Sequence, residues 1–233
     1  MTNRNLVVQF YMKPEGYSDP EYNSLRNNND LLKYSLKSAE LYAKKVGADY
    51  KLVTEPKVKW KHPTFERLDL FYNDKWWEDY DHILYLDTDV IVWPQAPSVF
   101  ELYKDLESFK PARDKRAERY KNEDHLRIIK GTCLEGEDIN WLRNNRFNAG
   151  VFMLNKKSAQ QMSPYLDCAA LDSDDNTMLV YAMLKSKVKV TKMNPLFNKK
   201  NGKYGTYFGH AFGGEKHKGN FIPLQQAKSI FDD

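Results

Sequence analysis

Near the middle of the chain, an apolar run is interrupted by two carboxylates: His82-Ile83-Leu84-Tyr85-Leu86-Asp87-Thr88-Asp89-Val90-Ile91-Val92. Its apolar residues predict a buried strand over 83–92, and strand alternation places Asp87 and Asp89 on one side. Carboxylate oxygens suit hard divalent cations such as Mg²⁺ and Mn²⁺, which bridge readily to a diphosphate. The pair therefore predicts a metal site that receives a nucleotide-linked substrate.

The elements before this run alternate between strand and helix. Apolar patterning predicts strands over 6–11 and 50–54, and helices over 30–46 and 64–77. Such alternation is typical of an α/β fold with a mostly parallel central sheet flanked by helices. The Asp pair would close its strand at the carboxyl edge of that sheet, where open α/β sheets bind their ligands.

The second half of the chain is less regular. A charged, poorly periodic segment over 101–146 is expected to be an insertion or acceptor-side region, followed by a strand over 147–154. A helix over 174–185, a short strand over 188–190 and a closing C-terminal loop over 198–221 complete the prediction. At 233 residues, without an internal repeat, we expect a single domain over 1–233.

Composition narrows the class of protein. Thirty-six basic and thirty-two acidic residues give a net charge of only +4, too balanced to indicate a nucleic-acid partner. The two cysteines, Cys133 and Cys168, lie far apart and suggest neither a disulfide framework nor a zinc site. Without a signal peptide or a run of about eighteen apolar residues, we expect no transmembrane segment and a soluble, cytoplasmic protein, in a bacterial or viral context for instance.

Four short motifs in order resemble those of the glycogenin-like retaining glycosyltransferases. They are 83–90 (ILYLDTDV), 147–152 (FNAGVF), 175–179 (DNTML) and 210–216 (HAFGGEK). The resemblance spans about residues 6 to 216, and the order and spacing are more specific than any one motif. It departs from the family after Lys216, where the usual Pro-Trp is replaced by His217-Lys218, and at Asn176, where Gln is usual.

This resemblance implies a GT-A fold and a set of site residues. Asp87, Asp89 and His210 would bind Mn²⁺, with Mg²⁺ possible as the ion. The residues expected near the nucleotide sugar are Phe10, Tyr11, Arg67, Thr88, Asn148, Ala149, Gly213 and Lys216. Those expected near the reacting centre are Asp172, Asp175 and Asn176.

Several of these residues have a plainer interpretation. His210 could be a surface histidine in a Gly-rich loop, and Arg67 an exposed helix charge. Phe10 could be core packing, since alternation points it away from Tyr11. The turn at 148–150 could contain Gly for backbone reasons, and the acidic cluster at 172–175 could merely cap the following helix.

The sequence thus predicts a metal-dependent glycosyltransferase. It would move a hexose from a nucleoside-diphosphate sugar, with UDP-sugar favoured, to a hydroxyl of a glycan or glycoprotein acceptor, with retention of configuration. One alternative is a nucleotidyltransferase acting on sugar phosphates, although the residues after the first strand lack its usual Gly-rich phosphate loop. The other is a non-catalytic carbohydrate-binding protein with the same fold.

Overall fold

The structure is a computed structural model, and it describes residues 4–12, 29–113, 126–127, 129–167, 173–211 and 222–232. A central five-stranded sheet has the order β2-β1-β3-β6-β5. Its strands are β1 (Asn5–Phe10), β2 (Asp49–Val53), β3 (His82–Leu86), β5 (Lys110–Arg113) and β6 (Phe147–Asn155). Only β6 is antiparallel to its neighbours, so four of the five strands share one direction. The mostly parallel α/β sheet is confirmed.

A second, smaller sheet lies beyond the carboxyl end of β3. It has the order β4-β8-β7 and consists of β4 (Val90–Val92), β7 (Lys199–Lys200) and β8 (Phe208–His210). β4 follows β3 directly in the chain, after a three-residue gap. The Asp pair therefore lies at the junction of the two sheets.

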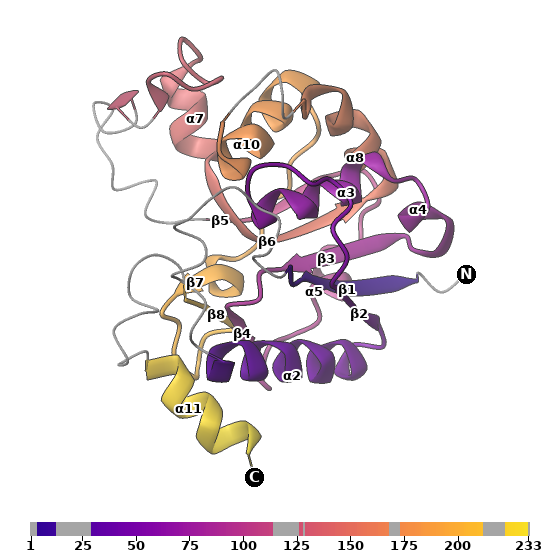
Figure 1. The fold of residues 1–233 in the computed structure, drawn as a ribbon, viewed down its shortest axis with the longest axis vertical. Coiled ribbons are helices and arrows are strands. Elements are labelled where there is room, and N and C mark those ends of the chain that lie inside the picture. The colour runs from indigo at the N-terminus through magenta and orange to yellow at the C-terminus, as the bar shows by residue number, and fades with distance from the viewer. Residues whose placement is uncertain are drawn as a thin grey trace.

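Helices cover both faces of the central sheet (Figure 1). The α-helices are α2 (Asn29–Lys45), α3 (Asp69–Tyr72), α4 (Trp76–Asp79), α5 (Val99–Leu102), α7 (Ile139–Asn145), α8 (Lys156–Met162), α10 (Asp175–Ser186) and α11 (Ile222–Phe231). Short 3-10 helices span Pro63–Leu68, Ser163–Tyr165 and Pro195–Asn198. In Figure 1, α2 lies on one side of the sheet, and α3, α8 and α10 lie on the other. Within the described residues, no helix has both the length and the apolar character of a membrane span.

The core reflects the alternation of side chains in the strands. Ile83 and Tyr85 of β3 join the apolar cluster under α8 and α10, whereas Leu84 and Leu86 join the cluster under α2. Both faces of the strand are therefore buried, as expected for a strand covered by helices on each side. β3 ends where this double burial stops, at the half-buried Asp87.

Four predicted elements differ from the structure. The segment 198–221, expected to be a loop, contains the strands β7 and β8. The strand over 83–92 is broken by a turn, in which the Val90 amide donates to the Asp87 carbonyl over 3.1 Å. The helix over 64–77 is three short pieces, because the polar stretch 73–75 favours a turn between α3 and α4. Residues 188–190 form no strand of their own, since only Val190 pairs, in an isolated bridge with Phe109.

The predicted insertion over 101–146 contributes directly to the sheet. Its residues 110–113 form the edge strand β5, and Lys110 has no exposed surface despite its charge. The Lys110 ammonium instead donates to the carbonyls of Asp105 and Ser108 over 2.6 and 2.9 Å. An acceptor-side role for the rest of this segment stays a prediction.

Candidate metal and donor site

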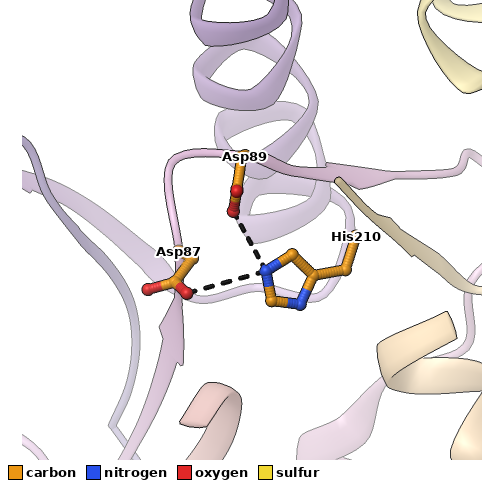
Figure 2. Close-up of side chains that lie close together, drawn as sticks. All are labelled: Asp87, Asp89 and His210. Atoms are coloured by element: carbon orange, nitrogen blue, oxygen red, sulfur yellow. Dashed lines mark ion pairs between the residues drawn. The ribbon is translucent and has the colours of Figure 1, made fainter. Parts of the chain in front are cut away.

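Three predicted metal ligands converge at the junction of the two sheets (Figure 2). His210 Nε2 lies 3.0 Å from Asp89 Oδ1 and 3.6 Å from Asp87 Oδ2. The ligand atoms of all three residues lie within 4.8 Å of one another. His210 is 1% exposed, which excludes the surface-histidine interpretation.

The backbone explains how residues so far apart in sequence meet. Asp87 and Asp89 lie in the turn between β3 and β4, and β4 pairs antiparallel with β8, so that Val90 is opposite His210. The Ala211 amide also donates to the Asp89 carbonyl over 3.0 Å. A turn and a cross-strand pair, rather than the alternation of one strand, therefore bring both carboxylates to the histidine.

The ligand atoms and a neighbouring glycine suit a bound divalent cation. Two carboxylates and one imidazole suit Mn²⁺, which accepts both oxygen and nitrogen ligands. A Cβ built on Gly150 would lie 2.0 Å from His210 Cε1 and 2.7 Å from Asp87 Oδ2. Any side chain there would fill the space between the ligands, so Gly150 is needed for the site to exist.

Arg67 is buried beneath this cluster and is not an exposed helix charge. Its side chain is 3% exposed, and Nη2 lies 3.1 Å from Asp87 Oδ1 and 3.0 Å from Asp175 Oδ2. Nη1 donates to the Ala149 carbonyl over 2.6 Å, and Nε donates to the Thr64 carbonyl over 2.8 Å. All three guanidinium nitrogens therefore have protein acceptors. The arginine joins the turn between β3 and β4 to the start of α10.

The charges around Arg67 are strongly coupled. Burial opposes the charged guanidinium, but the carboxylates of Asp175 and Asp87 outweigh it and hold the pKa of Arg67 above its usual value. Burial raises the pKa of Asp175, and Arg67 only partly offsets this effect. Burial likewise raises the pKa of Tyr85 well above 10.0, so its hydroxyl stays protonated and donates to Asp87 Oδ1. The Arg67 guanidinium thus lies between the carboxylates of Asp87 and Asp175.

Residues 148–150, predicted to form a donor-binding turn, instead lie in the first part of strand β6, and side chains from two other elements hydrogen-bond to this donor segment. Asn176, in the first turn of α10, accepts the Ala149 amide with its Oδ1 over 2.6 Å. Asn148 Oδ1 accepts the Gly150 amide over 3.0 Å, and Asn198 Nδ2 donates to the Asn148 carbonyl over 3.1 Å. Side chains of α10 and of the 3-10 helix Pro195–Asn198 therefore hold the donor segment beside the predicted metal ligands.

The acidic cluster before α10 divides into two roles. Asp174 is the N-cap, because its carboxylate accepts the Thr177 amide over 3.1 Å. Asp175 is the first residue of the helix and faces Arg67 instead. The capping interpretation therefore holds for Asp174 but does not account for Asp175.

The other predicted site residues are distributed as follows. Phe10 is 8% exposed and contacts the rings of Trp76 and Tyr85, in keeping with the packing alternative. Tyr11 and Thr88 are half-buried. Asp172, Gly213 and Lys216 lie outside the described residues.

Three residues that support the site were missed by the sequence analysis: Tyr85, Gln9 and Asn198. Gln9 has no exposed surface, and its Nε2 donates to the Asp87 carbonyl over 3.1 Å and to Ser35 Oγ over 3.0 Å. A glutamine inside an apolar strand was the available signal, because a buried amide requires partners. Asn198 gave no comparable signal, since its partners Asn148 and His210 are distant in sequence. Tyr85 lies two residues before its partner Asp87, but an aromatic residue in an apolar strand is ordinary and gave no signal either.

Comparison with known proteins yields structural neighbours but no sequence family. No protein-family model and no curated protein matches the chain. A glycosyltransferase involved in glycosylation of the major capsid of PBCV-1 is 10% identical, with a TM-score of 0.56 over 97% of this chain and 99% of that one. The galactosyltransferase LgtC, solved with donor and acceptor sugar analogs, is 14% identical, with a TM-score of 0.54 over 97% and 95%.

A third neighbour is a longer protein, of which this chain covers only part. The glycosyltransferase GlyE of Streptococcus pneumoniae is 15% identical, with a TM-score of 0.50 over 98% of this chain and 60% of that one. At such identities the likeness concerns the fold. The chain therefore has the GT-A fold of these glycosyltransferases.

Proposed function

We propose that the chain is a metal-dependent glycosyltransferase of the glycogenin-like retaining type. It transfers a hexose from a nucleoside-diphosphate sugar, with a UDP-sugar favoured, to a hydroxyl of a glycan or glycoprotein acceptor. The observation that carries this proposal is the convergence of Asp87, Asp89 and His210 around a space that Gly150 keeps clear. The neighbouring structures support it, because LgtC with this fold was solved with donor and acceptor sugar analogs.

The roles of the residues follow from their chemistry and position. Asp87, Asp89 and His210 would hold Mn²⁺, which would supply positive charge beside the departing nucleoside diphosphate. Asn148 and Ala149 lie in strand β6 beside these ligands and would orient the donor sugar through hydrogen bonds. Arg67 holds the Asp87 carboxylate in place and balances the charge of Asp175.

Three further groups of residues complete the proposed site. Asp175 and Asn176 lie at the start of α10 beside the donor segment, where the reacting carbon of the sugar would sit, and Asp172 would position the sugar. Tyr11 and Thr88 would contact the nucleoside and phosphates. Gly213 and Lys216 would close over the diphosphate, with the lysine ammonium pairing with its oxygens.

The proposal is tested with a panel of nucleotide sugars in the presence of Mn²⁺, Mg²⁺ or EDTA, scoring release of nucleoside diphosphate. We expect metal-dependent release from one donor, lost in Asp87→Asn and Asp89→Asn. Asp79→Asn is the matched control, because that carboxylate is 73% exposed and precedes the opposite end of β3. Full turnover in either site variant would contradict the metal assignment.

The same assay separates the alternatives. Release of pyrophosphate in place of nucleoside diphosphate would indicate a nucleotidyltransferase. A donor that binds, with no turnover in the presence of a glycan acceptor panel, would indicate the non-catalytic carbohydrate-binding protein.

A further inference from the structure

We infer that Asn198 is a positioning residue that holds His210 in the tautomer needed for metal binding and ties this ligand to the start of β6. The inference rests on the proposed function, because it concerns the same metal site. Asn198 ends the 3-10 helix Pro195–Asn198, is 7% exposed, and belongs to none of the motifs considered in the sequence.

The geometry joins two parts of the site through one amide group. Asn198 Oδ1 lies 2.7 Å from His210 Nδ1, and Asn198 Nδ2 lies 3.1 Å from the Asn148 carbonyl oxygen. His210 comes from the small sheet and Asn148 from the central sheet. Asn198 therefore bridges the two sheets directly behind the metal ligands.

The orientation of this amide follows from its second partner. A backbone carbonyl oxygen can only accept, so the NH₂ of Asn198 must face Asn148, and Oδ1 must face the imidazole. Oδ1 also can only accept, so the hydrogen must be on His210 Nδ1. Nε2 of the neutral ring then carries the lone pair and faces Asp89 and Asp87, which lie 3.0 and 3.6 Å away, so a cation between them would be bound by the lone pair and the carboxylate oxygens together.

The segment around Asn198 is held firmly enough to impose this orientation. Asn194 caps the 3-10 helix by accepting the Leu196 amide over 3.0 Å, and Pro195 begins it. Phe197 is fully buried, and the Tyr207 amide donates to the Leu196 carbonyl over 3.1 Å. Outer hydrogen bonds of this kind typically change metal affinity by about 10- to 100-fold.

The first test uses the unsubstituted, metal-free protein. Long-range ¹H–¹⁵N NMR of the histidine rings, at a pH where the imidazole is neutral, reports which nitrogen carries hydrogen. The His210 signal is the one absent from His210→Gln. We expect hydrogen on Nδ1. A dominant Nε2–H tautomer would overturn the inference without any substitution at Asn198.

The second test measures Mn²⁺ affinity by calorimetry in three variants. Asn198→Ala removes both hydrogen bonds, and we expect about 10- to 100-fold weaker binding together with a mixed tautomer. Asn198→Asp retains an acceptor for Nδ1–H, so the tautomer should persist and affinity should fall by less than about threefold, while the bond to Asn148 is lost. Asn194→Ala perturbs the same 3-10 helix without touching His210 and should bind Mn²⁺ as the unsubstituted protein does.

These outcomes distinguish the inference from the proposed function. Absence of Mn²⁺ binding by the unsubstituted protein would overturn the proposed function. Unchanged Mn²⁺ affinity and an unchanged tautomer in folded Asn198→Ala would overturn the role of Asn198 alone. If Asn198→Ala does not fold, loss of the Nδ1–H tautomer in Asn198→Asp would overturn the role, and its retention would support it.

Discussion

At the scale of single residues, one buried guanidinium balances two carboxylates. Arg67 compensates Asp175 and Asp87 while its Nη1 satisfies the Ala149 carbonyl. Removing one partner of a buried ion pair typically costs about 3–5 kcal/mol, because the remaining charge stays buried. We expect Arg67→Met to lower the free energy of unfolding by about that amount, measured by urea denaturation.

A second substitution isolates the charge effect. If the loss in Arg67→Met comes from the uncompensated carboxylate, Asp175→Asn in the same chain should recover part of it, as a double-mutant cycle measures. Arg143→Met is the matched control, since Arg143 is exposed and should change stability by less than about 0.5 kcal/mol. A loss of stability below about 1 kcal/mol in Arg67→Met would contradict the prediction, because it would mean that water solvates the remaining carboxylates.

His82 gives a pH-dependent prediction away from the site. It has no exposed surface, and its Nε2 lies 3.2 Å from the Asp105 carbonyl oxygen. Burial holds the pKa of His82 below 6.5 in the folded state. Below pH 6.5 the unfolded chain therefore binds a proton that the folded chain resists, and the unfolding free energy falls as pH decreases toward the folded pKa.

This contribution disappears in His82→Gln, whose amide can donate to the same carbonyl without titrating. Urea denaturation at pH 7.5 and 5.5 should show a smaller loss of stability in the variant, with the difference limited to about 1.4 kcal/mol per pH unit for one group. Equal pH dependence in the two proteins would mean that His82 does not titrate in this range.

At the scale of elements, helix α10 begins with two adjacent aspartates that have different roles. Asp174 caps the helix and Asp175 faces Arg67. Asp174→Ala should cost about 1 kcal/mol of stability through the lost cap, whereas Asp174→Asn should be nearly neutral because Asn caps equally well. Donor hydrolysis should be retained in both. Loss of hydrolysis in folded Asp174→Asn would give the Asp174 carboxylate a role in the reaction.

Element patterns account for what the sequence could and could not predict. Strands β1, β2, β3 and β6 and helices α2 and α10 follow from apolar periodicity, a local property of the chain. The break between β3 and β4 does not, because groups distant in sequence stabilise it. The Gly150 carbonyl accepts the Asp87 amide, and the Ala211 amide donates to the Asp89 carbonyl. Asp87 and Asp89 were predicted as metal ligands from the strand pattern and His210 from the resemblance, whereas the roles of Asn198 and Tyr85 required the tertiary structure.

Strand β6 carries the glycine on which the metal site depends. Gly150→Ala would place a methyl group 2.0 Å from the His210 ring, a distance at which the ring must move. We expect Mn²⁺ affinity to fall at least about tenfold, measured by calorimetry. Gly131→Ala is the control, because its φ of +74° makes alanine strained while its Cβ meets nothing within 4 Å. Gly131→Ala should lose stability and keep its Mn²⁺ affinity. Equal Mn²⁺ affinity in the two variants would contradict the requirement for glycine at position 150.

At the scale of the whole molecule, the candidate metal site joins the two sheets. Asp87 follows β3 of the central sheet, whereas His210 ends β8 of the small sheet, so an ion bound between them links both. An unfolded chain cannot hold these ligands together, and binding to the folded state alone must therefore raise its stability. The expected increase is about 2.7 kcal/mol at a free Mn²⁺ concentration one hundred times the dissociation constant.

This linkage can be measured without any substrate. Tm should rise with Mn²⁺, return to its starting value with EDTA, and shift little in Asp89→Asn or His210→Gln. Asp79→Asn should shift as the unsubstituted protein does, since its carboxylate is exposed and outside the site. The ion should also slow hydrogen exchange in both β3 and β8, because one ion restrains ligands from each. Protection confined to one sheet, or a full shift in His210→Gln, would mean that the ion binds elsewhere.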